Sequence, residues 1–264
     1  MPIPDRLNPT YGAAGAARAN ARADAIDEAR NRLIVALDVP SAAEAVQLVN
    51  GLERCCHWFK VGMELFTAAG PAAVAPIVAR GHQVFLDLKF HDIPNTVAGA
   101  VRSAAALGVR MVNVHALGGP AMLAAARKAL EGLANPPQLL AVTVLTSMDG
   151  GQLRAAGIEL KAAEEAELLA RMGLESGIRG FVCSPQEVGR LRELAGPEGV
   201  LVVPGIRPAG GDAGDQKRIS TPGEALRAGA SYLVVGRPIT QAADPAAAAE
   251  AILEEMAEAL ESGL

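Results

Sequence analysis

Short apolar runs recur along the chain from residue 32 onward, separated by longer stretches of mixed polarity. The runs are rich in Val, Ile and Leu and show little polar alternation, which is typical of strands buried on both faces of a sheet. The expected strands are 33–39, 57–63, 83–90, 111–117, 139–147, 180–184, 200–206 and 232–237.

Helices are expected between these strands, because apolar positions recur there with helical spacing among Ala, Glu and Arg. The helical stretches are 42–53, 70–81, 96–108, 121–132, 162–173, 185–196, 221–229 and 245–260. Alternating strands and helices form a parallel sheet through right-handed crossovers. Eight such units predict the α/β class and a single (β/α)8 TIM barrel. An open doubly wound sheet is the alternative, but no strand is followed by GxGxxG.

The first 31 residues differ from the rest, being rich in Ala and mixing Arg with Asp and Glu. They lack the apolar core of a secretory signal, and their acidic residues argue against a transit peptide. We therefore expect an N-terminal extension over 1–31, helical or disordered, followed by a barrel domain over 32–264.

Composition restricts the partners of the chain. The net charge of -5 and the aromatic content of 3% predict neither a nucleic-acid surface nor binding to anionic membranes. No apolar run approaches the roughly 18 residues of a membrane span. The three cysteines, Cys55, Cys56 and Cys183, show no CxxC spacing, and so low and odd a count favours a reducing, cytoplasmic location.

Polar residues gather where the expected strands end, which is the working face of such barrels. Charge is concentrated on the first three strands, more than packing alone requires. The strand-end residues are Asp38, Lys60, Asp87, Lys89, Asp92, Asn113, His115, Thr146, Ser147, Arg207, Gly236 and Arg237.

Asp87 and Lys89 are two positions apart on one strand, so their side chains are expected on the same face. If Leu86 and Leu88 face the helices, the two charges face the barrel interior, where Lys60 can join them. At an effective dielectric constant near 20, unit charges about 4 Å apart interact by roughly 4 kcal/mol. The alternation of acid and lysine then keeps every group charged.

Two other interpretations of this cluster stay open. It can be an ion-pair network that only stabilises the barrel top. It can also be a metal site built from Asp87, Asp92 and a neighbouring histidine, although the interposed lysines supply competing positive charge.

A Gly-rich loop over 204–218 follows the seventh strand, and Gly236 and Arg237 follow the eighth. Phosphate sites in TIM barrels are commonly found after these two strands. The loop is also longer than an ordinary strand-to-helix connection, as expected of a segment that closes over a ligand.

The stretch FLDLKFHDIPNT over 85–96, with VALD before it and VTVLTSM, PGIRP and GRPIT after it, resembles the bacterial orotidine 5'-phosphate decarboxylases. The resemblance runs from about residue 32 to about residue 255 and leaves the extension unexplained. It implies conversion of orotidine 5'-phosphate to UMP and CO2 in de novo pyrimidine biosynthesis, without a metal or organic cofactor. It also implies a chain of alternating charges, with Lys89 as proton donor, made of Lys60, Asp87, Lys89 and Asp92.

The resemblance implies substrate contacts as well. Asp38 and Lys60 would bind the ribose hydroxyls, Asp87 would lie near the departing carboxylate, and Thr146 would contact the base. Arg207 and Gln216 would bind from the Gly-rich loop, and Gly236 and Arg237 would bind the phosphate. Asp92 and Thr96 would enter the site from a partner subunit, which implies a homodimer with two shared active sites.

Two further hypotheses accompany this one. The chain could be a Mg²⁺-dependent sugar-phosphate aldolase or decarboxylase of the same superfamily, which shares the DxKxxD pattern but lacks the FHDIPNT continuation. It could also be a catalytically inactive binding protein, for which a charge of the cluster should be missing; none is missing here.

Overall fold

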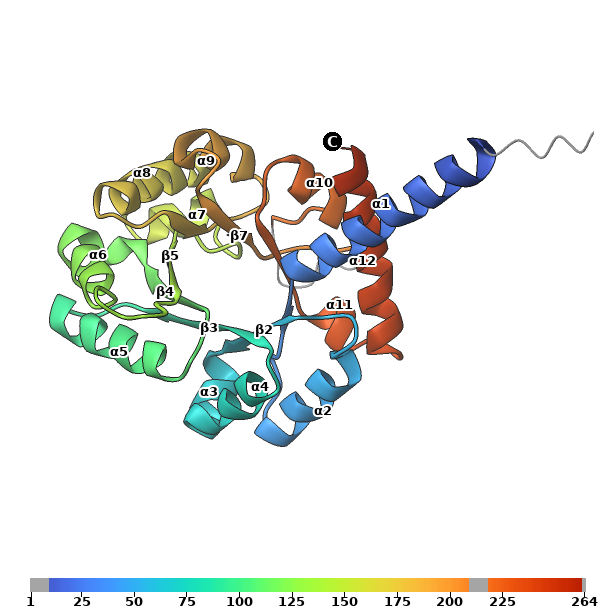
Figure 1. The fold of residues 1–264 in the computed structure, drawn as a ribbon. Coiled ribbons are helices and arrows are strands. Elements are labelled where there is room, and N and C mark those ends of the chain that lie inside the picture. Colours follow the sequence, from blue (N-terminus) through green and yellow to red (C-terminus); the bar gives the residue numbers. More distant parts are fainter. Residues whose placement is uncertain (1–9, 209–217, 263–264) are drawn as a thin grey trace, which may run out of the picture.

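The computed structural model describes residues 10–208 and 218–262, with side chains from residue 20 onward. Within these residues, parallel strands pair in chain order from β1 to β8, and β8 pairs with β1 to close a barrel (Figure 1). The (β/α)8 barrel predicted from the alternation of strands and helices is therefore confirmed. The strands are β1 Leu33–Ala36, β2 Trp58–Gly62, β3 Gln83–Phe90, β4 Met111–His115, β5 Gln138–Val142, β6 Gly180–Val182, β7 Val200–Val203 and β8 Tyr232–Val235.

Most strands end earlier than their apolar runs do. β5 ends at Val142 and β7 at Val203, whereas the runs continue to residues 147 and 206. Val144 and Ile206 lie beyond the paired segments and are still buried. The apolar runs therefore predicted the buried residues correctly, but backbone pairing between the strands ends a few residues before the runs do.

The helices surround the barrel, and seven of the eight expected helical stretches each coincide with one helix, to within a few residues at the ends. They are α2 Ala42–Leu52, α5 Pro94–Ala106, α6 Gly119–Lys128, α8 Ala162–Glu175, α9 Val188–Ala195, α10 Pro222–Arg227 and α12 Pro245–Ser262. The pattern alone missed α3 Met63–Ala69, η2 Ala116–Gly118, α7 Gly150–Ala155 and α11 Arg237–Thr240.

The single helix expected over 70–81 is instead two short helices, η1 Gly70–Ala73 and α4 Ala75–Ala79. Pro71 and Pro76 each lie in the first turn of one of them. Proline lacks the backbone N–H that a helix interior requires, so each of the two prolines begins a new helix.

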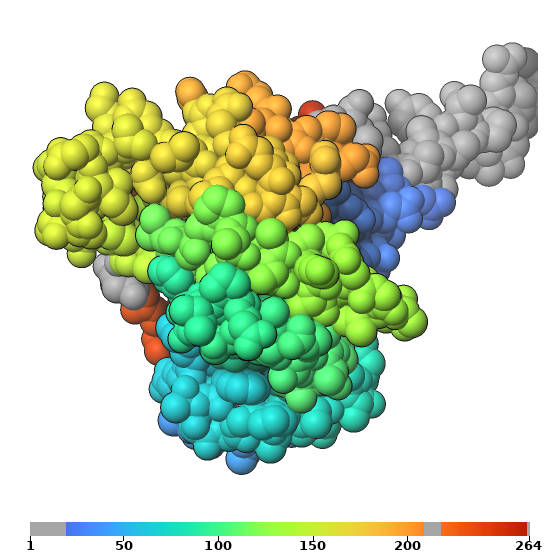
Figure 2. All heavy atoms as spheres, turned by 90° about the vertical axis from the view of Figure 1, so that its left-hand side faces the viewer, coloured from blue at the N-terminus to red at the C-terminus, as the bar shows by residue number. Residues whose placement is uncertain are grey.

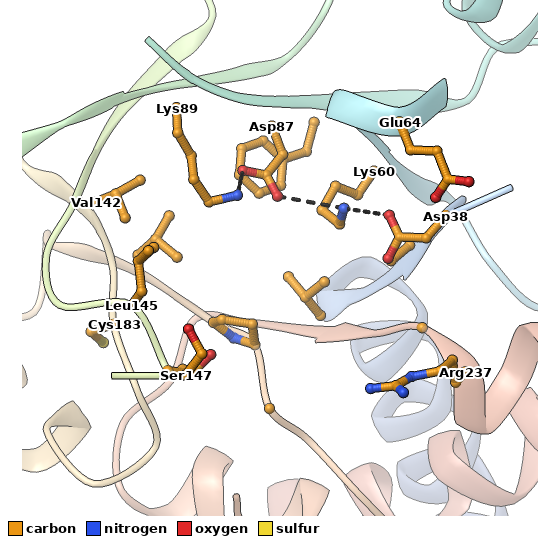
Figure 3. Close-up of a pocket in the computed structure, with 18 of the residues that line it drawn as sticks. Asp38, Lys60, Glu64, Asp87, Lys89, Val142, Leu145, Ser147, Cys183 and Arg237 are labelled. Carbon is orange, nitrogen blue, oxygen red and sulfur yellow. Dashed lines mark hydrogen bonds and ion pairs between the residues drawn. The ribbon is translucent and has the colours of Figure 1, made fainter. Parts of the chain in front are cut away.

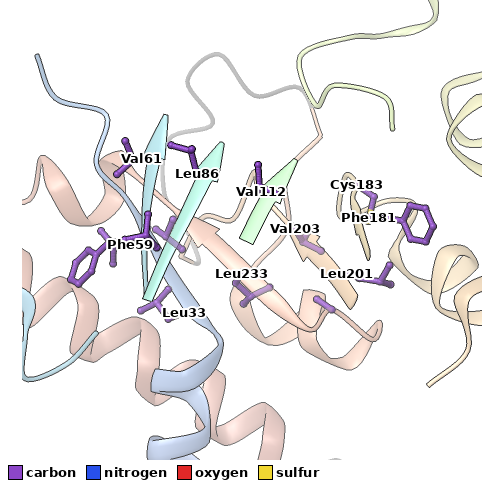
Figure 4. Packing of buried hydrophobic residues seen from close by; sticks show 14 of the residues in the cluster. Leu33, Phe59, Val61, Leu86, Val112, Phe181, Cys183, Leu201, Val203 and Leu233 are labelled. Carbon is purple, nitrogen blue, oxygen red and sulfur yellow. The ribbon is translucent and has the colours of Figure 1, made fainter. Parts of the chain in front are cut away.

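Buried side chains divide into an outer layer between strands and helices and an inner layer inside the barrel. On β1, Leu33 and Val35 belong to the outer layer, and Ile34 and Ala36 to the inner one. Figure 4 shows outer-layer residues such as Val61, Leu86 and Val112 on neighbouring strands. Successive residues of a strand point to opposite faces, so each strand supplies both layers.

The N-terminal segment forms α1, Thr10–Arg32, which lies against α12 and projects beyond the barrel at its N-terminal end (Figure 1). Ala25 and Ala29 are buried in this contact region. Arg22 forms ion pairs with Glu254 and with Glu261 of α12, the latter at 3.1 Å. Of the two states expected for the extension, the described part is helical.

Figure 2 views the molecule from the side of α5 and α6, whose residues form the green middle of that face. Cyan residues of β2 to α4 lie below them, and yellow residues of α7 and α8 lie above. The elements thus follow one another around the barrel in chain order. Across the described part of the chain, no helix combines the length and the hydropathy that crossing a membrane requires.

We expect Gly173→Ala in α8 to lower the free energy of unfolding by about 1–3 kcal/mol. A Cβ at this buried position would lie 2.7 Å from Cε1 of Phe181, which is itself fully buried. This clash outweighs the gain of about 1 kcal/mol in helix propensity.

The matched control is Gly51→Ala in α2, where a Cβ would meet no atom within 4 Å apart from its chain neighbours and the nearby backbone of its own helix. There we expect a gain of about 0.5–1 kcal/mol. Urea titration of both variants checks the pair, and equal stability changes would contradict the packing described between α8 and β6.

Candidate active site

A cavity of about 490 Å³ opens at the carboxyl ends of the strands. Among the described residues, those predicted for the site and found in its lining are Asp38, Lys60, Asp87, Lys89, Thr146, Arg207, Gly236 and Arg237. Strands β1, β2, β3, β5, β7 and β8 or the loops that follow them bring these residues together. Gln216 lies outside the described residues.

Four charged groups form a chain of ion pairs along one wall of the cavity (Figure 3). Nζ of Lys89 lies 2.6 Å from Oδ1 of Asp87, and Nζ of Lys60 lies 3.4 Å from Oδ2 of the same carboxylate. Lys60 also reaches Oδ1 of Asp38 at 2.9 Å. The predicted convergence of Lys60 with Asp87 and Lys89 is thus observed.

Both central groups of this chain are buried, with 8% of Lys60 and 9% of Asp87 exposed. Burial opposes ionisation of Asp87, but the ammonium groups of Lys60 and Lys89 outweigh it and lower the pKa of this carboxyl. Burial likewise opposes the charge of Lys60, and Asp87 and Asp38 raise its pKa above the ordinary value. The two central groups therefore keep each other charged near neutral pH.

The backbone that presents Lys89 is not a regular strand. The pairing of β3 with β4 shifts register between Leu86 and Phe90, and Lys89 has a φ of 49°. It is the one non-glycine residue of the described chain with a positive φ, a conformation that costs an L-residue about 1–2 kcal/mol. The same-face spacing predicted that Lys89 would lie beside Asp87 and face the barrel interior, and both residues do line the cavity, although Lys89 is not extended.

Asp92 and Thr96 are exposed and do not line the cavity of their own chain. They lie in the segment between β3 and α5 and in the first turn of α5. Oδ1 of Asp92 accepts a hydrogen bond of 2.6 Å from the backbone N–H of Ile93. Of the four charged residues predicted to form a chain, Lys60, Asp87 and Lys89 are connected within one protomer, and Asp92 is not connected to them.

Arg207 lies on the loop that follows β7, and Arg237 is the first residue of α11, just after β8. Arg207 is buried and donates to the carbonyl of Ile206 at 2.8 Å. Arg237 lies across the cavity from the lysines (Figure 3). A Cβ on the neighbouring Gly236 would approach Ala36 and Asp38 within 3.5 and 3.7 Å, so the glycine brings this backbone close to the ribose candidate Asp38.

A buried ion pair between Arg218 and Glu187 was not predicted from the sequence. Arg218 also donates to the carbonyls of Val144 and Leu145 at 3.1 and 2.8 Å, and both of these residues line the cavity. The pair therefore supports the loop that carries Thr146. No periodicity or motif marks these two residues, since their pairing depends on loops 31 positions apart in the chain.

His91 and His115 stack with ring centroids 5.3 Å apart. Burial, together with His91 and Lys89, lowers the pKa of His115 to about 4, so this ring is neutral at physiological pH. In the described parts of the chain, no three His, Cys, Asp or Glu side chains converge as a metal site would need. The cysteines, all three buried, form no disulfide.

Residues 31–252 match the family model described as orotidine 5'-phosphate decarboxylase / HUMPS family. The chain is 56% identical over 234 residues to the orotidine 5'-phosphate decarboxylase of Moorella thermoacetica, covering 86% of this chain and 93% of the relative. It is 52% identical over 228 residues to that of Saccharophagus degradans, covering 86% and 96%.

A crystal structure of orotidine 5'-phosphate decarboxylase from Lactobacillus acidophilus superimposes with a TM-score of 0.74 at 41% identity, covering 85% of this chain and 98% of that one. The residues matched by the family model leave out most of α1 and include every described residue of the cavity lining. The chain therefore belongs to the orotidine 5'-phosphate decarboxylase / HUMPS family.

Proposed function

We propose that this chain is an orotidine 5'-phosphate decarboxylase that releases CO2 and UMP in de novo pyrimidine biosynthesis. The observation that carries the proposal is the contact of 2.6 Å between the partly buried Lys89 and the buried Asp87 in the cavity wall. Relatives that are more than half identical over most of the chain bear the name of this enzyme. We also infer a cytoplasmic enzyme whose catalytic unit is 32–264, preceded by the extension 1–31.

The reaction breaks the bond between C6 of the pyrimidine and its carboxylate, and the electron pair stays on C6. The ring delocalises this in-plane pair poorly, so catalysis has to supply a large stabilisation, within a range that extends to ~23 kcal/mol. A fixed ammonium on Lys89, directed at C6, stabilises the developing carbanion and then donates the proton that completes UMP. Water returns a proton to Lys89, and no cofactor takes part in this scheme.

Asp87 has two roles in the proposed reaction. It holds the ammonium of Lys89 in place, and its negative charge lies near the departing carboxylate and disfavours the bound substrate. Asp87 is suited to both roles because its pKa is lowered by Lys60 and Lys89 against the opposing effect of burial. The carboxylate therefore stays ionised at the pH at which the enzyme works.

The remaining cavity residues are proposed as contacts to the nucleotide. Asp38 and Lys60, 2.9 Å apart, are positioned together for the ribose hydroxyls, and Thr146 for the base. Arg207, Gly236 and Arg237 would hold the phosphate, with Gln216 of the Gly-rich loop. These phosphate candidates lie after β7 and β8, where TIM barrels commonly bind phosphate.

We further propose a homodimer in which Asp92 and Thr96 complete the partner's site. The segments that follow the neighbouring strands β2, β3 and β4 each expose a large apolar side chain, namely Met63, Ile93 and Leu117 at 57%, 67% and 45%. Such a grouping of exposed apolar residues is typical of an interface. If a second copy of the chain covered this surface, the three apolar side chains would be buried. Asp92 and Thr96 would then face the cavity of the partner subunit.

Lys89→Ala should reduce kcat with orotidine 5'-phosphate by at least ~10³-fold, because it removes both the electrostatic stabilisation and the proton donor. UMP should still bind, since the proposed ribose and phosphate contacts remain. Loss of absorbance of orotidine 5'-phosphate and calorimetric titration with UMP measure the two effects. Lys128→Ala, at the exposed end of α6, is the matched control, and near-normal turnover by Lys89→Ala would refute the role given to Lys89.

Mixing Lys89→Ala chains with Asp92→Ala chains should restore activity if the sites are shared. In a mixed dimer one site then has both substitutions and the other has neither, so random exchange restores about a quarter of the sites. Steady-state rates after exchange measure the recovery, and differently tagged chains verify that exchange took place. With exchange verified, an inactive mixture would show that Asp92 acts within its own chain.

A metal-dependent sugar-phosphate enzyme remains the second candidate, because the matching family model extends beyond the decarboxylases of orotidine 5'-phosphate. The ammonium groups at 2.6 and 3.4 Å from Asp87 favour the first candidate, since they occupy the space around the carboxylate that a cation would need. Turnover of orotidine 5'-phosphate should therefore be unchanged in excess EDTA. Abolition by the chelator and recovery with Mg²⁺ would favour the second candidate.

A further inference from the structure

Asn113 of β4 lies directly behind the Asp87 and Lys89 pair. Its side chain is completely buried in the barrel, and it does not line the cavity. It interrupts the apolar run of β4, where every neighbour from Met111 to Val114 is hydrophobic. A buried amide is unfavourable unless its donor and acceptor are both satisfied, so its contacts indicate why it is there.

The amide makes one contact with each member of the pair. Its Nδ2 donates to Oδ1 of Asp87 at 2.7 Å, and its Oδ1 accepts from the backbone N–H of Lys89 at 2.8 Å. Oδ1 of Asp87 is also the oxygen that receives Nζ of Lys89. One side chain thus holds the carboxylate of Asp87 and the backbone of Lys89 in a fixed relation.

The contact to Lys89 falls where regular pairing fails. β3 and β4 change register between Leu86 and Phe90, and the left-handed φ of 49° at Lys89 lies within that irregularity. The amide oxygen of Asn113 accepts the N–H of Lys89 at this irregularity. Strained backbone persists only when its surroundings determine it, and Asn113 supplies such a contact.

We propose that Asn113 is a positioning residue for the decarboxylation, setting both the direction of the Lys89 ammonium and the orientation of the Asp87 carboxylate. The inference rests on the proposed function, because it takes the reaction at Lys89 as its readout. Asn113 touches no substrate, and it acts entirely through these two residues. Among uncharged side chains of this size, a primary amide combines a strong donor and a strong acceptor in one plane.

Asn113→Leu keeps the approximate size of the side chain and removes both contacts. We expect kcat with orotidine 5'-phosphate to fall by about 10²-fold, the usual cost of displacing a catalytic group by about 1 Å. KM and the dissociation constant of UMP should change less than ~3-fold, because the proposed ribose and phosphate contacts are intact. If Asn113 only filled space, its replacement by Leu would not lower kcat while leaving KM nearly unchanged.

Asn113→Asp distinguishes the hydrogen bonds from packing through pH. At low pH the new carboxyl is protonated, and it can donate to Asp87 while accepting from Lys89, as the amide does. As pH rises, it ionises beside Asp87, and two adjacent carboxylates repel each other. The ratio of the variant's kcat to that of the wild type should therefore decrease as pH increases.

Asn113→Leu should show the opposite pH trend. The amide of Asn113 is one of the groups that lower the pKa of Asp87, after Lys60 and Lys89 and against burial. Its loss raises that pKa, so the acid limb of the rate profile moves to higher pH and the variant is most impaired at low pH. Opposite trends in two variants of one position would not arise from a general loss of stability.

Thr143→Val is the matched control, a fully buried polar residue just beyond β5 whose hydroxyl donates to the carbonyl of Val182 at 3.0 Å. It should leave kcat within ~3-fold of the wild type, since it contacts neither Asp87 nor Lys89. If Asn113→Leu does not fold, the pH trend of Asn113→Asp decides the question.

Failure of the proposed function and failure of the inference about Asn113 would give different results. An inactive wild type that binds UMP normally would refute the proposed function. An active wild type with unchanged kcat in Asn113→Leu, or with a kcat ratio independent of pH in Asn113→Asp, would overturn the inference about Asn113.

Discussion

Burial of the Asp87 carboxylate is the constraint on which the arrangement of the site depends. A buried charge is strongly unfavourable unless cations and hydrogen-bond donors compensate it. Lys60 of β2, Lys89 of β3 and Asn113 of β4 do so from three neighbouring strands. The cluster therefore exists only when these strands are paired, and the folded barrel is a condition for the charged state of each member.

Along the barrel axis, the apolar residues that pack the interior are separate from the charged residues that line the cavity. The inner layer of the barrel is apolar, with Ile34, Phe85 and Val234 among its members, and the charged residues begin one inward position further along β3, at Asp87. A well-packed interior resists deformation. It can therefore hold the strained backbone of Lys89 and keep four charges in a fixed geometry above it.

Other contacts support the cavity from a distance. Arg218 and Glu187 connect the loops that follow β5, β6 and β7, and a broken buried pair of this kind is costly because one charge remains uncompensated. α1 packs instead on α12 through Arg22 and buried alanines. The family match begins at residue 31, so it leaves out most of this helix and covers the described lining of the cavity.

Local sequence determined the alternation of strands and helices, and with it the barrel. The period of two in a strand also predicted the shared face of Asp87 and Lys89, although the backbone of Lys89 is not extended. Pro71 and Pro76 divide the segment 70–81 into two short helices, but the apolar spacing of this segment predicted a single helix. Tertiary structure alone decided the left-handed backbone of Lys89 and its bond to Asn113 24 positions away. These features depend on the register between strands and on barrel closure, and periodicity along one strand carries no information about either.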